Sequence, residues 1–475
     1  MDGNSQRPKS GNQKPLRIFF SGIGGSGVSA LAGFAAEKGH LVSGSDRAFD
    51  KDPSLPVFGA LLAKGIRLVQ QDGNGLDGGT DLAVFSTAVE PGTPEYKKAA
   101  ETGLNTITRP EYLARLSSEF RTIAVAGTSG KSTSSGMLAW LLKELGFAPN
   151  FIGGGRVKRF ATETNQGNYL TGGSDILVIE ACESDGSIIN YHPAFSVLLN
   201  LALDHHSISE TGAMFETLSK NTSGPTVFNA DDEELLKLSL KNSVSFGIDR
   251  PADYMAEDIR LSGFGAQFVF KGGACGPGLM KLNVPGRHNV YNALAALALV
   301  DRLAAGSGMR MDNAALARAL AGFDGVQRRF DVHLNKNGIT VIDDYAHNPH
   351  KIAAFMAAAQ RISTKICYIF QPHGYGPARM MRQGYAEAFS GGLRAEDLLI
   401  MLPIYYAGGT TQKDISSEML AEDIAARGKA AIAVKDRQAA AQAALGFDCI
   451  IVLGARDDTL SRFASELASF KSKPV

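Results

Sequence analysis

The stretch RTIAVAGTSGKST, residues 121–133, constrains this chain most, because it joins a buried strand to a helix through a glycine-rich loop. Such a loop wraps backbone N–H groups around nucleotide phosphates, while its lysine reaches the terminal phosphates and its hydroxyl binds Mg²⁺. The strict pattern has another glycine where Val125 stands, which indicates a special subclass rather than a generic ATPase. The predicted ATP-binding loop consists of Gly127, Thr128, Ser129, Gly130, Lys131, Ser132 and Thr133.

Two later segments place polar side chains after apolar runs that we expect to be strands of the same sheet. The run DILVIE leads into EACESD (180–185), and the run FSVLLNLALD, expected to be a strand to its last residue, leads into Asp204, His205 and His206. Carboxylates at the carboxyl end of a strand beside a phosphate loop are placed to bind Mg²⁺. A lone histidine is usually structural, but this pair follows a strand of the same sheet and favours a metal or phosphate site.

A second glycine-rich loop lies near the N-terminus, in the sequence LRIFFSGIGGSGVS. Gly22, Gly24, Gly25 and Gly27 follow a strand and open a helix, as in loops that bind a pyrophosphate at a helix N-terminus. Asp46 lies about 20 residues on, where a dinucleotide-binding fold places the acid that holds a ribose. A mere tight turn would not explain the strand, helix and acid together. NAD and UDP both carry a pyrophosphate and a ribose, so the ligand stays open on this motif alone.

The alternation of apolar runs with helical stretches predicts α/β structure throughout. A length of 475 residues is typical of about three domains. We expect a Rossmann-like N-terminal domain over 16–116, a central ATPase domain with the phosphate loop over 117–324, and a Rossmann-like C-terminal domain over 325–475. The C-terminal domain is predicted from five strand candidates, which are GITVIDD, KICYIF, DLLIML, AAIAV and DCIIVLG.

Composition excludes several classes of protein. Lys+Arg and Asp+Glu balance at 48 each, so no overall field favours nucleic acid or an anionic membrane as a partner. No apolar run approaches the roughly 18 residues that span a bilayer, and the polar opening stretch has no secretory signal. The four cysteines share no CxxC spacing, which argues against a zinc site or a disulfide framework. We therefore expect a cytoplasmic protein that is a monomer or a homodimer.

Taken together, the motifs resemble the Mur ligase family, and most closely its members that join L-alanine to UDP-N-acetylmuramate. The similar segments follow in the family's order: GIGGSGVSALAGFAAEKGHLVSGSD, AVAGTSGKSTSS, EACESD, NLALDHHSIS, VPGRHNVYNALAALAL, GVQRRFDV, VIDDYAHNPHKI, FQPHGYGPAR and PIYYAGG. The resemblance covers nearly all of the chain after the polar tail. It implies an enzyme that uses ATP and Mg²⁺ to couple a sugar carboxylate to an amino acid through an acyl phosphate.

The resemblance also implies roles for individual residues. Lys131, Glu183 and His205 would be catalytic, with Ser132, Glu183 and His205 at the metal ion. His288 and Asn292 would lie near adenine, and Arg329 and Asp344 would bring the C-terminal domain onto ATP. The UDP-sugar site would comprise Gly22, Gly24, Gly25, Gly27, Ser29, Asp46, Ser86 and Thr87. The acceptor site would comprise His347, His373, Tyr375 and Arg379.

The chain departs from the family at several positions in or beside these motifs. Ser129 and Cys182 stand where the family usually has His and Asp. Gly374 and Pro377 replace two arginines expected near the acceptor, and Arg379 or Arg382 would have to substitute for them. The acceptor could therefore be a whole muropeptide, as in recycling ligases. The sequence is also compatible with an NAD-dependent oxidoreductase and with a Mur-like protein that has lost turnover.

Overall fold

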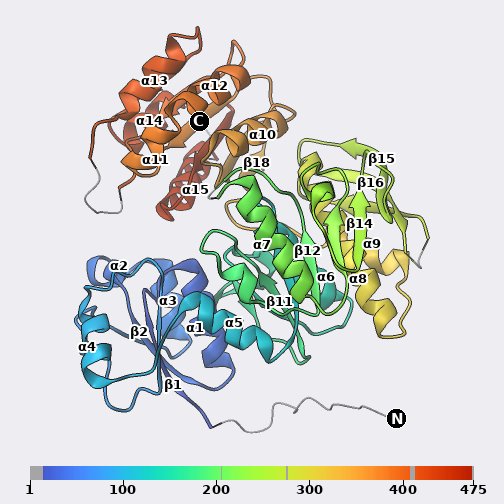
Figure 1. Ribbon diagram of the computed structural model, residues 1–475. Coiled ribbons are helices and arrows are strands. Elements are labelled where there is room, and N and C mark those ends of the chain that lie inside the picture. The colour runs from blue at the N-terminus through green and yellow to red at the C-terminus, as the bar shows by residue number, and fades with distance from the viewer. Residues whose placement is uncertain (1–13, 205, 274–275, 407–411, 473–475) are drawn as a thin grey trace. The chain divides into compact units, whose positions relative to one another are not determined.

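The computed structural model describes residues 14–204, 206–273, 276–406 and 412–472, which form α/β structure with three large sheets (Figure 1). The chain forms two compact units. The first comprises Met1–Glu257, Val269–Met280 and Tyr291–Phe323. The second comprises Asp258–Phe268, Lys281–Val290 and Asp324–Val475.

The N-terminal sheet is parallel and has the strand order β3-β2-β1-β4-β5. Its strands are β1 (Arg17–Ser21), β2 (Leu41–Ser45), β3 (Arg67–Val69), β4 (Leu82–Phe85) and β5 (Thr106–Thr108). Its helices are α1 (Ser26–Glu37), α2 (Arg47–Lys51), α3 (Pro56–Ala63), α4 (Pro94–Thr102) and α5 (Arg109–Ser118). The order reverses between β1 and β4, and ligands of such sheets bind beyond the carboxyl ends of the strands at this point. The N-terminal glycine loop follows β1, and Ser86 follows β4.

Alternating side chains of β1 pack into two apolar clusters, as expected for a strand buried on both faces. Phe19 packs in a small cluster with Ala83, Phe85 and Ala99. Ile18 and Phe20 belong to a larger cluster that continues into the central sheet. This shared core explains why the N-terminal and central sheets fall in one compact unit.

The central sheet has ten strands in the order β10-β7-β11-β6-β12-β13-β14-β15-β16-β17. The strands are β6 (Arg121–Ala126), β7 (Asn150–Ile152), β10 (Tyr169–Leu170), β11 (Ile176–Glu180), β12 (Phe195–Leu198), β13 (Thr226–Asn229), β14 (Ser243–Gly247), β15 (Tyr254–Leu261), β16 (Ala266–Gly272) and β17 (Gly278–Leu282). A two-stranded sheet, β8 (Ala161–Thr162) with β9 (Asn165–Gln166), is separate from it. The helices are α6 (Lys131–Glu144), α7 (Ile208–Asn221), α8 (Arg287–Gly306) and α9 (Asn313–Ala321), with short 3₁₀ turns η1 (Lys158–Phe160), η2 (Ser187–Asn190) and η3 (Leu235–Lys237). Because β11, β6 and β12 are parallel neighbours, the loops after them lie at one edge of the sheet.

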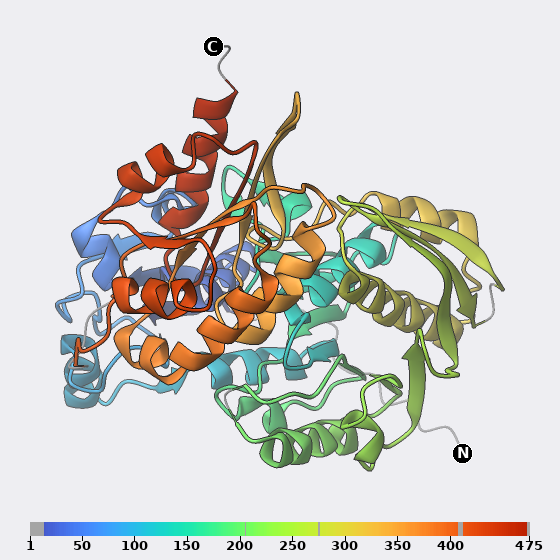
Figure 2. The ribbon, with the colours of Figure 1, turned by 90° about the horizontal axis from the view of Figure 1, so that it is seen from above.

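The C-terminal sheet has the order β18-β19-β23-β20-β21-β22, with β18 antiparallel to the rest. Its strands are β18 (Asp331–Lys336), β19 (Ile339–Asp344), β20 (Cys367–Gln371), β21 (Leu398–Met401), β22 (Ala431–Ala433) and β23 (Cys449–Gly454). Its helices are α10 (Pro349–Ala359), α11 (Tyr375–Met380), α12 (Arg382–Gly392), α13 (Ser417–Ala425), α14 (Arg437–Ala443) and α15 (Thr459–Lys471). Tyr368 and Phe370 of β20 pack toward α10, α12 and α13, while Cys367 and Ile369 pack toward α14 and α15. The sheet is therefore covered by helices on both faces (Figure 2).

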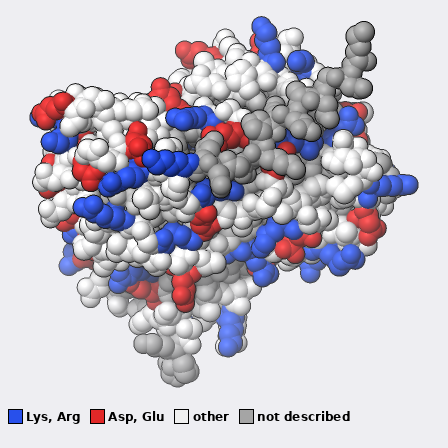
Figure 3. Space-filling model, turned by 90° about the horizontal axis from the view of Figure 1, so that it is seen from below, with Lys and Arg blue, Asp and Glu red and all other residues white. Residues whose placement is uncertain are grey.

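The distribution of charged side chains on the surface (Figure 3) agrees with the equal numbers of basic and acidic residues in the sequence. Basic and acidic side chains are interspersed over the face drawn in Figure 3. Within the described ranges, no helix is both long and apolar enough to cross a bilayer.

The α/β prediction, with three sheet-bearing parts, is confirmed. One strand prediction was too long: β12 ends at Leu198, so Asp204 lies in a loop well beyond it. After Leu198 the chain forms hydrogen bonds with the phosphate loop instead of a neighbouring strand. Asn200 O accepts from Thr128 N, and Ala202 N donates to Thr128 Oγ1. The predicted domain boundaries stay a prediction; α5 runs across the first of them.

Candidate active site

The central phosphate loop joins β6 to α6 at the edge where three parallel strands end. Gly130 is the N-cap of α6 with φ +86°, a left-handed conformation that glycine tolerates and other residues rarely adopt. A Cβ atom on Gly130 would lie 2.6 Å from Asn292 Oδ1, so the close approach also requires glycine. No side chain caps the first turn of α6, so its N–H groups are open to an anion.

Lys131, at the start of α6, is held in an ion pair. Its Nζ donates to Gly127 O at 2.6 Å and to both carboxylate oxygens of Glu183 at 3.0 and 2.9 Å. Burial disfavours the charged amine, but the Glu183 carboxylate, together with other acidic neighbours including Glu180, holds the pKa of Lys131 above its usual value. Lys131 is therefore a cation, positioned to meet a phosphate.

Glu180, the last residue of β11, is hydrogen-bonded to Ser132, the residue that follows Lys131. Its Oε1 accepts from Ser132 Oγ at 2.9 Å, and its Oε2 accepts from Gly154 N at 2.8 Å. A hydroxyl and one or two carboxylates, completed by phosphate oxygens and water, form a usual Mg²⁺ site. Ser132 and Glu180, with Glu183 nearby, therefore fit this ion. Among the described residues no cluster of three His, Cys, Asp or Glu side chains is preformed for a metal.

Two asparagines brace the phosphate loop. Asn200, just after β12, bonds both the N–H and the carbonyl of Ser129, at 2.8 and 2.9 Å. Asn292 on α8, predicted near adenine, accepts from Ser134 Oγ at 2.9 Å. Sequence reasoning missed Asn200 and Glu180 as individual site residues. A polar residue inside the apolar run FSVLLNLALD was the signal that could have identified Asn200.

The Asp-His segment after β12 is described only in part. The predicted metal ligand His205 lies outside the described residues. His206 has a ring nitrogen 3.3 Å from the carbonyl oxygen of Ser184, which belongs to the acidic segment. The role of His205 stays a prediction.

The N-terminal glycine loop connects β1 to α1. Gly22 has φ +77°, and a Cβ there would lie 2.8 Å from Ser86 Cβ, so the loop packs on the residue that follows β4. The N-cap of α1 is Gly25, which offers no side-chain bond to the helix. The backbone N–H groups at this helix end are therefore free of a capping side chain, as an anion site requires.

Asp46 and Ser29 both form hydrogen bonds within the protein. The two carboxylate oxygens of Asp46 accept from Gly24 N at 2.8 Å and Ala48 N at 2.7 Å. Ser29 is buried and accepts from Asn168 Nδ2 at 3.0 Å. Asp46 thus shapes the loop and caps α2. Ser86 is half-buried and Thr87 exposed, so both can be reached from solvent.

In the second unit, two consecutive arginines follow Gly325. Arg329 lies 4.9 Å from the ring centre of Tyr345, and Asp344 accepts from Phe330 N and Ala346 N, both at 2.7 Å. Burial, partly offset by Arg329, raises the pKa of Asp344 to about 6. His288, the other residue predicted near adenine, lies against Gly286 at the start of α8, where a Cβ would lie 2.5 Å from its ring.

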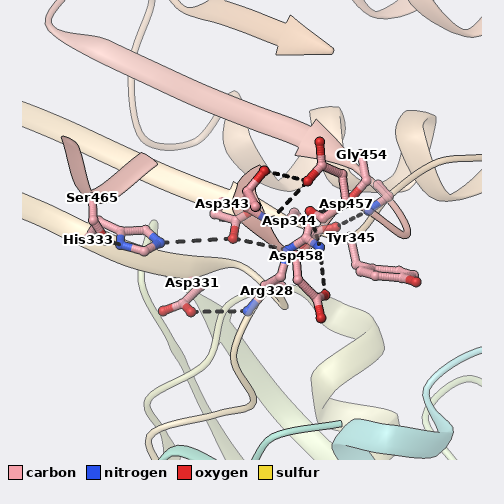
Figure 4. A network of polar contacts seen from close by, with 12 residues as sticks. Arg328, Asp331, His333, Asp343, Asp344, Tyr345, Gly454, Asp457, Asp458 and Ser465 are labelled. Carbon is pink, nitrogen blue, oxygen red and sulfur yellow. Dashed lines mark hydrogen bonds and ion pairs between the residues drawn. The ribbon is translucent and has the colours of Figure 1, made fainter. Parts of the chain in front are cut away.

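Arg328 holds this turn in place, a role not predicted from the sequence (Figure 4). It has φ +58° and is 6% exposed, and its guanidinium donates to Gly454 O at 2.7 Å, Asp457 O at 3.1 Å and Asp343 Oδ2 at 3.3 Å. It therefore ties the segment before β18 to the end of β23, which fixes the backbone of Arg329.

The predicted acceptor residues lie together in part. The rings of His347 and His373 meet edge to face at 4.9 Å between centroids. Burial lowers the pKa of His347 to about 3 and that of His373 to about 4, so both rings are neutral near pH 7. Tyr375 instead packs on Tyr406, at 5.4 Å between ring centroids.

Three segments of this chain match family models along their length: "Mur ligase family, catalytic domain" at residues 17–121, "Mur ligase middle domain" at 125–300 and "Mur ligase, glutamate ligase domain" at 328–456. A protein of Nostoc punctiforme named UDP-N-acetylmuramate–L-alanine ligase is 35% identical over an alignment of 433 positions that covers 86% of each chain. A Sulfurihydrogenibium protein of the same name is 32% identical and covers 95% of this chain and 99% of its own. The chain belongs to the Mur ligase family.

Solved structures agree with this assignment. The UDP-N-acetylmuramate–alanine ligase MurC of Thermotoga maritima has a TM-score of 0.78 and 28% identity, and the match covers 96% of this chain and 99% of that one. A murein peptide ligase of Psychrobacter arcticus has a TM-score of 0.69 at 22% identity, covering 97% and 99%, and shows the shared fold. Mur ligases use ATP, and a more distant relative of the fold, MurF of Thermotoga maritima, was solved with ADP.

Within this Mur ligase, the two arginines considered as substitutes in the acceptor loop are both ion-paired. Arg379 of α11 pairs with Asp414 and also donates to Gln412 O at 3.1 Å. Arg382 of α12 donates to both oxygens of Asp423, at 2.6 and 2.9 Å. Either arginine would have to release a carboxylate before it could bind that of an amino acid.

Proposed function

We propose that this Mur ligase uses ATP to join the carboxylate of UDP-N-acetylmuramate to the amine of an amino acid, with L-alanine as the first candidate. The single observation that carries the proposal is the phosphate loop, in which Lys131 and Ser132 face Glu183 and Glu180 at one sheet edge. Relatives named for this reaction, at 32–35% identity over most of the chain, support the choice of substrates.

In the proposed reaction a carboxylate oxygen of the sugar attacks the γ-phosphorus of ATP, and ADP leaves. The amine of the acceptor then attacks the acyl carbon, and inorganic phosphate leaves while the amine loses a proton. Lys131 would neutralise the repulsion between the carboxylate and the γ-phosphate. Ser132, Glu180 and Glu183 would hold Mg²⁺, which when bound polarises the phosphate oxygens. Because ATP and UDP-N-acetylmuramate, which donate the phosphoryl and acyl groups, are both nucleotides, we also propose the cytoplasm as the compartment.

The loop at Gly22–Gly27 would bind the diphosphate of the sugar nucleotide. Its N–H groups at the start of α1 have no capping side chain, and Gly24 N is fixed by Asp46. Asp46 shapes this loop by accepting two backbone N–H groups, and each of its carboxylate oxygens keeps a lone pair that would accept from the ribose.

A muropeptide acceptor is the second candidate. The side chains of Gly374 and Pro377 donate no hydrogen bond, and the two nearby arginines are ion-paired. A peptide acceptor would need fewer contacts to an α-carboxylate at this place than a free amino acid does.

Release of phosphate from ATP with Mg²⁺, UDP-N-acetylmuramate and each acceptor in turn tests the proposal. We expect release that requires both the sugar nucleotide and L-alanine, and that Lys131→Ala abolishes. Release with a muropeptide alone would select the second candidate. A lack of release with every acceptor, from a folded protein that binds ATP, would refute the ligase proposal.

A further inference from the structure

Arg109, the first residue of α5, lies against the N-terminal glycine loop. A Cβ atom built on Gly27 would be 3.4 Å from Arg109 Cδ and 3.9 Å from its Nη1. Gly27 is in the first turn of α1, so the guanidinium lies beside the helix end where a diphosphate is expected. No motif in the sequence identified this arginine.

This is an unfavourable place for a cation without an anionic partner. The N-terminus of α1 carries a partial positive charge, and its first turn contains no acidic residue and no capping side chain. Arg109 also stands at the N-terminus of its own helix, α5. In α5, however, Thr108 and Glu111 form a capping box that satisfies the first N–H groups. The first turn of α1 has no such cap, since the Asp46 carboxylate accepts from Gly24 N in the loop before the helix.

The carboxylate of Asp185 is the ion-pair partner of Arg109. Arg109 Nη2 donates to Asp185 Oδ2 at 2.6 Å, and the other oxygen of Asp185 accepts from Ser187 N at 3.0 Å and Ser187 Oγ at 2.6 Å. The side chains of Arg109 and Asp185 are 21% and 20% exposed, so solvent and ligands can reach the pair. Partly exposed ion pairs contribute little to stability, and such a pair can exchange its partner.

We propose that Arg109 is a substrate-binding residue that takes the diphosphate of the sugar nucleotide as its partner in place of Asp185. This rests on the proposed function. A guanidinium matches two phosphate oxygens with parallel N–H groups, which an ammonium does not. Asp185 is the last residue of the acidic segment that also carries Glu183. When Arg109 exchanges Asp185 for the diphosphate, the Asp185 carboxylate would lose its ion-pair partner while Glu183 stays paired with Lys131.

The test measures affinity by calorimetry for UDP-N-acetylmuramate, UDP-N-acetylglucosamine and UDP, in the full chain and its variants. Arg109→Gln should weaken all three about ten- to hundredfold, the effect of losing a charge-assisted pair. Arg109→Lys should recover only part of it. Asp185→Asn, which removes the competing charge but keeps an acceptor for Ser187, should bind all three more tightly. Arg115→Gln, at an exposed arginine of the same helix, is the matched control.

The outcomes separate the possibilities. Equal affinities for wild type and Arg109→Gln would overturn the proposal, as would Asp185→Asn weakening binding as much as Arg109→Gln, because the pair would then be structural. A loss confined to UDP-N-acetylmuramate would place Arg109 at the sugar carboxylate and also overturn it. If the wild type binds none of the three ligands, the proposed function fails first. Unchanged binding of a non-hydrolysable ATP analogue verifies the fold of each variant.

Discussion

Removing the lysine of the phosphate loop should destabilise the protein as well as stop its turnover, because Lys131 neutralises a buried carboxylate. Glu183 is 3% exposed and both its oxygens accept from Lys131 Nζ, at 3.0 and 2.9 Å. Loss of one member of a buried ion pair costs about 3–5 kcal/mol. The Lys131 side chain keeps 12% of its surface exposed, so we expect about 3 kcal/mol for Lys131→Ala, the lower end of that range.

The double variant Lys131→Ala/Glu183→Gln makes the reasoning sharper. It removes both charges, so no buried carboxylate is left without a partner. Its loss of stability should be smaller than the sum of the two single losses by about 0.5–3 kcal/mol, the coupling expected for residues in direct contact.

The assay is unfolding in urea followed by tryptophan fluorescence. The chain has one tryptophan, Trp140, and it lies on α6, the helix that begins at Lys131. Trp140 is 8% exposed and its Nε1 donates to Ala319 O at 2.8 Å, so its emission reports the unfolding of this part of the first unit. Strictly additive losses, or a stability of Lys131→Ala equal to that of wild type, would refute the ion-pair account.

Three further predictions concern ligands and pH. UDP-N-acetylmuramate should raise the melting temperature of wild type and NAD should not. Gly24→Ala should remove this shift, because the new Cβ would lie 2.9 Å from Phe58 Cε1 and 3.0 Å from Asp46 Oδ2, whereas in the control Gly59→Ala the new Cβ meets open space. If Arg379 binds the acceptor, Arg379→Ala should raise the KM for L-alanine about tenfold or more and Arg382→Ala should change it little; equal kinetics in wild type and both variants would exclude both arginines. Burial lowers the pKa of His373 to about 4, so the contribution of this neutral ring to the free energy of unfolding should be fully present above pH 6.5 and fall as the pH drops toward 4, since the unfolded ring takes up a proton first. His373→Gln should weaken this pH dependence. A pKa near 6.5 measured for His373 by NMR in the folded protein would contradict it.

The sequence predicted the parts of the fold that have a strong period or a fixed turn. The phosphate loop is specified by its glycines, because Gly127 and Gly130 have φ +145° and +86°. The long helix over RHNVYNALAALAL and the five C-terminal strands were evident from apolar runs. Short strands such as β3 and β7, of three residues each, carry no period that a reader of the sequence could detect.

What the sequence could not predict is which partner each polar side chain takes. Asp46 has the spacing of a ribose-binding acid, and it also accepts one backbone N–H as the cap of α2 and another from Gly24. Arg328 and Arg329 are adjacent and both lie over the ring of Tyr345, but Arg328 is also buried in a network with β19 and β23. Arg109 and Asp185 are 76 residues apart, and only the packing of two sheets in one unit brings them together.

The central claim, coupling through an acyl phosphate, is tested most directly by following oxygen. UDP-N-acetylmuramate labelled with ¹⁸O in its carboxylate is incubated with ATP, Mg²⁺, L-alanine and the full chain, and both products are analysed by mass spectrometry. The account predicts one ¹⁸O atom in the released phosphate for each amide formed, and the other in the amide carbonyl. Unlabelled phosphate, or phosphate released without an amide product, would contradict it.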